Sequence, residues 1–107
     1  MRTFELRVYT LRSADALKFY GEAIYPRHLA SFPLFGIEAH GFWTADADAL
    51  PRLFVLVSYA PGDQPGEVGQ RYMQSQEFAN DIRNFDVSDI VSVESTILIP
   101  SNGSPLS

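Results

Sequence analysis

The sequence has no cysteine, few basic residues and no long apolar run, and each absence excludes a class of protein. Without cysteine there is no disulfide framework, no thiolate nucleophile and no cysteine-ligated zinc or iron–sulfur site. The chain carries 8 Lys and Arg against 13 Asp and Glu, a formal charge of −5. It therefore lacks the positive charge that binds phosphate backbones or anionic lipids, and we expect neither a nucleic-acid partner nor a membrane partner.

The start of the chain is also unlike a secretory signal. Arg2, Glu5 and Arg7 interrupt the first seven positions, where a signal peptide would have an uncharged apolar core. No run of about 18 apolar residues, the length that a membrane-spanning helix needs, occurs further along. These features predict a soluble, cytoplasmic protein.

What the sequence does contain is enough apolar surface for one folded domain. The 107 residues are 46% hydrophobic and include 8 Phe, 5 Tyr and 1 Trp, which suits a single core. We place this domain at residues 1–100. Small polar residues follow Pro100, so residues 101–107 are predicted to form a flexible C-terminal tail.

In the first third of the chain, apolar residues first alternate with a period of two and then recur with the spacing of a helix. Residues 3–11 alternate between two sides and predict a strand. A helix is predicted from about Ser13, a good N-cap, to Phe32, with a kink near Glu22 or Tyr25 because Pro26 lacks an amide donor. Its inward stripe comprises Leu17, Tyr20, Ile24 and His28.

The rest of the chain predicts three more strands and one more helix. Residues 37–44, 50–59 and 90–99 are rich in β-branched and aromatic residues, which favour strands. A second helix is predicted to begin at Pro65, which suits a first helical turn, and to fade over residues 80–84. Its inner stripe comprises Val68, Tyr72, Ser75, Ala79 and Ile82, with Phe78 alongside.

The resulting order, βαββαβ, is that of an α+β, ferredoxin-like fold. Two right-handed crossovers place both helices on one face of a four-stranded antiparallel sheet and leave the other face bare. We expect Leu11, Leu56 and Leu98 on this bare face. A symmetric partner is the usual cover for such a surface, so we predict a homodimer whose sheets pack face to face.

Several sequence blocks resemble the NIPSNAP family. They are residues 4–11, Gly41-Phe42-Trp43, Tyr59, Arg71, Phe78 and residues 93–100. The resemblance implies a dimeric α+β barrel, but it implies no reaction, because the wider barrel group includes cofactor-free monooxygenases, haem-degrading enzymes, lactone isomerases and structural proteins. In the third strand, where relatives often carry Asn, His and Trp, this chain has Pro51, Val55 and Val57.

One candidate site lies on the first strand. Glu5, Arg7 and Tyr9 project to one side, where Glu94 and Thr96 could join them around a bound molecule. The structural alternative is that Arg7 forms an ion pair with Glu5 or Glu94, because a partly buried guanidinium nearly always has an acceptor.

A second set of candidates lies on the helices and the second strand. His28 could act as a base or ligate a haem iron, or it could be a hydrogen-bonded core histidine. Trp43 offers a flat surface to an aromatic ligand or simply packs in the core. Tyr72 is predicted to point inward. His28 and His40 are twelve residues apart and form no metal motif, so no metal and no cofactor are predicted.

These residues support three main functional hypotheses, with haem binding as a fourth. The first is that a small apolar or aromatic organic molecule binds between the helices and the sheet, with Arg7, Trp43 and Tyr72 as ligand-binding residues. The second is a cofactor-independent monooxygenase or isomerase acting on an activated aromatic or lactone substrate, in which Tyr9 or His28 handles a proton and Arg7 stabilises an enolate. The third is a non-catalytic assembly or trafficking partner with the cleft closed by side chains.

Overall fold

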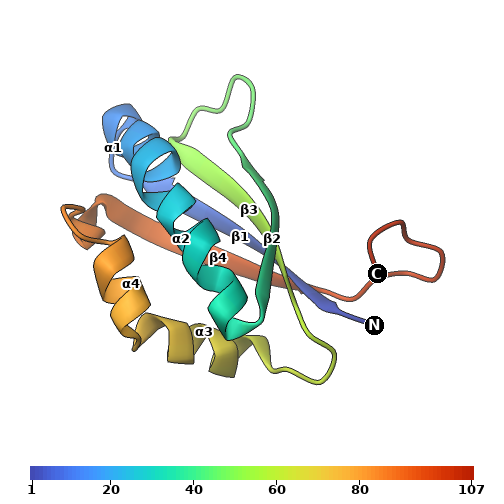
Figure 1. Cartoon of the computed structure of the whole chain (residues 1–107). Coiled ribbons are helices and arrows are strands. Elements are labelled where there is room, and N and C mark those ends of the chain that lie inside the picture. Colours follow the sequence, from blue (N-terminus) through green and yellow to red (C-terminus); the bar gives the residue numbers. More distant parts are fainter.

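A computed structural model describes residues 1–107 and contains one four-stranded sheet with helices on one of its faces (Figure 1). Every pair of neighbouring strands is antiparallel, and the order across the sheet is β2-β3-β1-β4. This confirms the predicted ferredoxin-like order. The strands are β1 (Thr3–Leu11), β2 (Ile37–Trp43), β3 (Arg52–Tyr59) and β4 (Ile90–Leu98).

The first helical segment is continuous but changes its winding. Ser13 caps it as predicted, since its side chain accepts a 3.0 Å hydrogen bond from the amide of Ala16. Where the kink was expected, the structure has a π-helical turn just before Pro26, in which the amide of Tyr25 donates to the carbonyl of Tyr20. The segment consists of α1 (Ala14–Phe19), η1 (Tyr20–Ile24), α2 (Tyr25–Ser31) and η2 (Phe32–Phe35).

The second helical segment is two helices and not the single helix that the sequence pattern predicts. α3 (Pro65–Met73) ends before Ser75, and Ser75 caps α4 (Gln76–Asp81) by accepting a 3.1 Å hydrogen bond from the amide of Phe78. A serine hydroxyl competes with the helical hydrogen bonds and favours a cap, so Ser75 is not part of an inner stripe. Ala79, also placed in that stripe, is exposed. A short turn, η3 (Val87–Asp89), leads into β4.

Gly36 ends η2 in the left-handed region, with φ of 74°. A Cβ is strained there, so Gly36→Ala should lower the free energy of unfolding by about 1 kcal/mol. Gly69 in α3 is the matched control, because it has no positive φ and an added methyl group meets open space. Gly69→Ala should raise the stability by up to about 1 kcal/mol in the same urea titration. Equal effects of the two substitutions would contradict this assignment.

Leu11 lies on the opposite face of the sheet from the one predicted. Glu5, Arg7 and Tyr9 point toward the helices, and Leu11 follows them into the core with only 1% of its surface exposed. Placing Leu11 on the bare face was therefore wrong, because the polar side of β1 is the covered side. Leu56 and Leu98 do lie on the bare face, since they pair with Leu6 and Phe4 across β1.

Outside the sheet, the C-terminal residues turn back toward the start of the chain (Figure 1). The amide of Ser104 donates to the carbonyl of Ser101, and the Arg2 guanidinium donates to the carbonyl of Ser107 at 3.0 Å. No helix in the structure combines the length and the hydropathy needed to cross a membrane.

Candidate functional site

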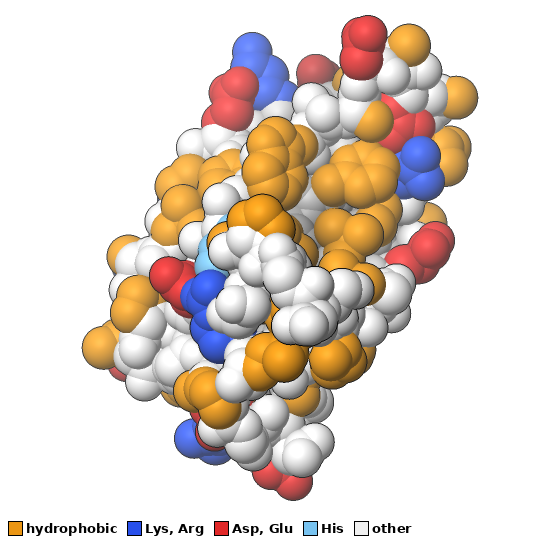
Figure 2. Space-filling model, turned by 90° about the vertical axis from the view of Figure 1, so that its right-hand side faces the viewer, with side chains coloured by type: hydrophobic (Ala, Val, Ile, Leu, Met, Phe, Trp, Pro, Cys, Tyr) orange, Lys and Arg blue, Asp and Glu red, His pale blue; other side chains and the backbone are white.

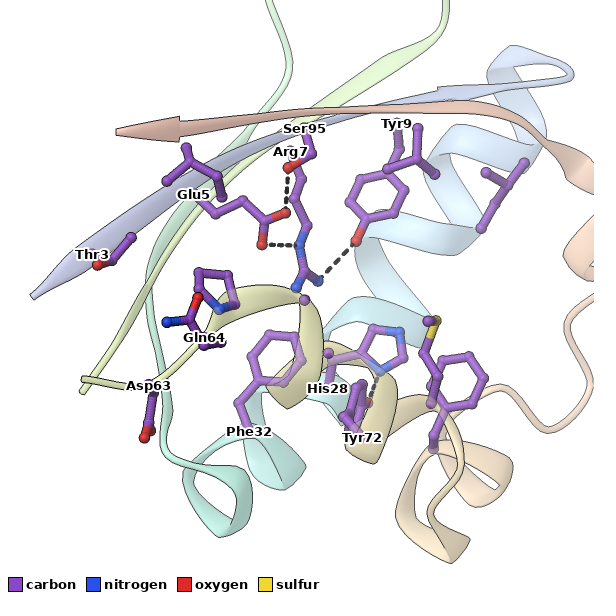
Figure 3. A pocket seen from close by; sticks show the side chains of 18 of the residues that line it. Thr3, Glu5, Arg7, Tyr9, His28, Phe32, Asp63, Gln64, Tyr72 and Ser95 are labelled. Carbon is purple, nitrogen blue, oxygen red and sulfur yellow. Dashed lines mark hydrogen bonds and ion pairs between the residues drawn. The ribbon is translucent and has the colours of Figure 1, made fainter. Parts of the chain in front are cut away.

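A cavity of about 980 Å³ separates the helix-facing side of β1 and β4 from α3 and α4. Its apolar lining comes from the sheet and from the helices, and includes Phe32, Phe78, Ile82, Phe85, Val93 and Ile97. Figure 3 shows the polar side chains that interrupt this lining: Arg7 and Tyr9 reach in from the sheet, and His28 and Tyr72 from the helices. The volume and the mixture of apolar walls with a few polar groups are typical of a small-molecule site.

The guanidinium of Arg7 is held by its neighbours on the sheet. Its Nε donates to Glu5 Oε1 at 2.8 Å, one Nη donates to the Tyr59 hydroxyl at 2.8 Å, and the other lies 3.4 Å from the Tyr9 hydroxyl. Glu5 also accepts hydrogen bonds from Tyr59 and Ser95. The predicted ion pair between Arg7 and Glu5 is therefore present, and it lies in the cavity wall (Figure 3).

These contacts keep Glu5 charged and leave Arg7 able to bind a ligand. Burial raises the pKa of the Glu5 carboxyl, but the charge of Arg7 and the hydrogen bonds from Ser95 and Tyr59 outweigh it and bring the pKa below 4.5. A guanidinium has five N–H groups, of which the contacts with Glu5, Tyr59 and Tyr9 occupy three. Two donors remain for an oxygen atom in the cavity.

His28, Tyr72 and Asp81 form a second polar cluster on the opposite wall. The Tyr72 hydroxyl donates to Asp81 Oδ2 at 2.6 Å, and His28 Nδ1 contacts the Tyr72 hydroxyl and lies 3.3 Å from the same carboxylate oxygen. The three residues come from α2, α3 and α4. In one continuous helix, Tyr72 and Asp81 would lie on opposite faces, and the break at Ser75 allows both to point inward. His28 Nε2 makes no hydrogen bond with the protein, and the ring borders the cavity.

His28 is neutral in the folded protein at neutral pH. Burial lowers the pKa of the imidazole, and the nearby Asp81 carboxylate opposes this without cancelling it, so the pKa lies below 6.5. The His28 imidazole can therefore accept a proton or a hydrogen bond from a molecule in the cavity.

The depressed pKa of His28 predicts how stability depends on pH. Because the unfolded chain binds the proton more tightly, the stabilisation is complete above about pH 6.5 and is lost as the pH falls through the folded-state pKa. Urea titrations at a series of pH values should show this loss in the wild type and a weaker one in His28→Gln. An unchanged pH dependence in His28→Gln would contradict the prediction.

The cavity brings together four of the five predicted site residues, namely Arg7, Tyr9, His28 and Tyr72. Trp43 lies outside it and is 54% exposed. It belongs to β2, at the sheet edge opposite β4, where it borders a smaller hollow of about 370 Å³ beside α1.

Two other residues proposed to join the site, Glu94 and Thr96, lie elsewhere. They pair with Val8 and Leu6 and therefore share the outer face of the sheet. Ser95, between them, is the β4 residue that points into the cavity and donates to Glu5.

Sequence reasoning missed Ser95, Tyr59 and Asp81. The alternation of side chains along a strand gave a signal for Ser95 and Tyr59. Ser95 stands between Val93 and Ile97 on one side of its strand, and Tyr59 lies on the same side as Val55 and Val57. No periodic signal identifies Asp81, because the break at Ser75 changes the phase of the helix that carries it. The structure contains no group of three His, Asp or Glu side chains able to hold a metal ion.

Comparison with known proteins gives one family. A family model described as NIPSNAP matches residues 4–105. A solved NIPSNAP family protein from Agrobacterium tumefaciens is 24% identical, with a TM-score of 0.74 over 100% of both chains. An uncharacterized NIPSNAP domain protein from Burkholderia xenovorans is 17% identical, with a TM-score of 0.76 over 96% of this chain and 98% of the other. No curated protein matches the sequence.

Proposed function

The chain belongs to the NIPSNAP family, and we propose that it binds a small apolar or aromatic organic molecule between its helices and its sheet, as a homodimeric α+β barrel. The observation that carries the proposal is the cavity of about 980 Å³, whose apolar walls surround Arg7 and His28. A cavity that is open also favours ligand binding over a purely structural role, for which the cleft is expected to be closed by side chains.

The charges in the cavity indicate what kind of polar group the ligand carries. The positive charge of Arg7 is already balanced by Glu5, so a phosphate or another strong anion gains little there. The two remaining N–H donors of Arg7 fit a carbonyl or hydroxyl oxygen. The ligand is therefore a mostly apolar molecule with an oxygen-bearing end.

The proposed dimer is supported by the outer face of the sheet, which no helix covers. Its apolar side chains include Leu6, Val8, Phe54, Leu56 and Leu98. Figure 2 views the molecule from the side on which the termini lie, and shows several apolar side chains across this face, with charged and other polar side chains between and around them. A second copy of the chain, with its sheet packed against this one, would bury that surface in both protomers.

Binding can be tested with 2-tetralone, an apolar aromatic ketone, by isothermal titration calorimetry. The wild type should bind it with a submillimolar Kd, given the size of the ligand and the apolar walls. Val93 lines the cavity from β4 and is half exposed, so Val93→Trp should fill the cavity without disturbing the core and weaken binding about tenfold or more.

The matched control is Val91→Trp, which makes the same change on the same strand at a residue outside the cavity lining. It should bind 2-tetralone as the wild type does. Equal affinities of the wild type and Val93→Trp would contradict the cavity as the binding site.

A further inference from the structure

The hydrogen bonds around His28 define which of its nitrogens carries the proton. Burial and the nearby Asp81 raise the pKa of the Tyr72 hydroxyl, so the hydroxyl keeps its single proton and donates it to Asp81. The contact between His28 Nδ1 and the Tyr72 oxygen then needs a proton on Nδ1. The neutral imidazole has only one N–H, so Nε2 carries a free lone pair.

The imidazole ring is also fixed in direction. Phe32 and Phe78 lie nearly parallel to it, at interplanar angles of 13° and 5° and centroid distances of 5.8 and 6.0 Å. Only 3% of the His28 surface is exposed. The free lone pair is therefore held in place, shielded from bulk water, and directed at the cavity that the ring borders.

On the opposite wall, Arg7 supplies what a base in this position needs. Figure 3 shows the guanidinium and the imidazole facing the same space from the sheet and from the helices. Two N–H groups of Arg7 have no protein acceptor, and Glu5 prevents the guanidinium from rotating away. An oxygen that becomes negative during a reaction would be stabilised there.

Building on the proposed binding function, we propose that His28 Nε2 is the general base for proton-transfer isomerisation of small apolar or aromatic carbonyl compounds. Nε2 removes a proton from the carbon next to the carbonyl, and the C–H electron pair forms the enolate. Arg7 and the Tyr9 hydroxyl hydrogen-bond the enolate oxygen. The imidazolium then returns the proton to a carbon of the enolate, so no oxidant or cofactor is consumed. Tyr72 and Asp81 are positioning residues that fix the tautomer.

Exchange of hydrogen for deuterium in 2-tetralone measures the first step directly. In D2O near neutral pH, wild-type protein should accelerate loss of the proton signal next to the carbonyl, followed by ¹H NMR, above the rate in buffer. His28→Gln should lower the protein-dependent rate about a hundredfold or more and still bind the ketone in calorimetry. His40→Gln, which changes the chain's other histidine, should keep the wild-type rate.

The outcomes separate this inference from the function on which it rests. If 2-tetralone binds the wild type but exchanges at the buffer rate, or if His28→Gln exchanges as fast as the wild type, His28 is not a base. If 2-tetralone does not bind at all, the proposed binding function fails as well. ¹⁵N NMR of the wild type adds a test that needs no variant, since finding the neutral proton on Nε2 would overturn the inference.

Asp81→Asn tests the positioning role. The charged and titratable groups around His28 are Asp81 from α4, Tyr72 from α3, Arg7 from β1, Tyr20 from η1, and Arg27 and Tyr25 from α2. Without the carboxylate, the Tyr72 hydroxyl is free to donate to Nδ1, so the proton should move to Nε2 in the ¹⁵N spectrum. The exchange rate should fall, and the acidic limb of its pH–rate profile should shift to lower pH. The affinity for 2-tetralone should be retained. An unchanged tautomer and pH profile would contradict the role of Asp81.

Discussion

Glu5→Leu is expected to lower the free energy of unfolding by about 3–5 kcal/mol, because it leaves the Arg7 charge without a partner in the wall of the core. Both side chains are largely buried, at 15% and 11% exposure for Arg7 and Glu5. The substitution also removes the acceptor for the hydroxyls of Tyr59 and Ser95. Urea denaturation at pH 7 measures the change.

The double substitution Glu5→Leu with Arg7→Met is the control for this loss. Removing both charges eliminates the unpaired guanidinium, and an apolar pair of similar volume is often close to neutral in stability. The double variant should therefore be more stable than Glu5→Leu alone. If Glu5→Leu unfolds like the wild type, the ion pair is not a structural part of the cavity wall.

The second large effect concerns assembly. Leu56 lies on β3 in the outer face, where Leu56→Arg would bury two uncompensated charges, one from each copy, in the proposed interface. The variant should be monomeric at micromolar concentrations at which the wild type is dimeric. A loss of at least about 3 kcal/mol in the free energy of dimerisation corresponds to a dimer Kd raised about a hundredfold or more. Sedimentation equilibrium measures both proteins.

Leu34→Arg provides the matched control for assembly. Leu34 is an exposed leucine in η2 and not on the outer face of the sheet, so the same substitution there should leave the dimer intact. A wild-type protein that sediments as a monomer at micromolar concentration would contradict the face-to-face dimer.

The strands were predictable because alternation reports directly which residues share a face, and their antiparallel arrangement was predictable from the βαββαβ order of elements. Alternation cannot report which face the helices cover. On β1 the charged residues Glu5 and Arg7 suggest solvent, yet this side is buried because the two charges pair with each other and with Tyr59. Leu11 was misplaced for the same reason.

The site was predictable in part. Tyr9, Arg7, His28 and Tyr72 stand within apolar patterns, and the fold gathers them around one cavity. Their partners depend on tertiary features that a pattern does not contain. Asp81 reaches His28 only because the helix breaks at Ser75, and Trp43 is separated from the cavity only by the order of the strands.

A crystal structure of the protein with 2-tetralone is the most direct test of the cavity as a ligand site. The expected result is electron density for the ketone between α2, α3 and the sheet, with its oxygen within hydrogen-bond distance of the Arg7 guanidinium and the carbon beside the carbonyl facing His28 Nε2. A cavity closed by its own side chains, or a ketone bound only on the outer face of the sheet, would contradict it.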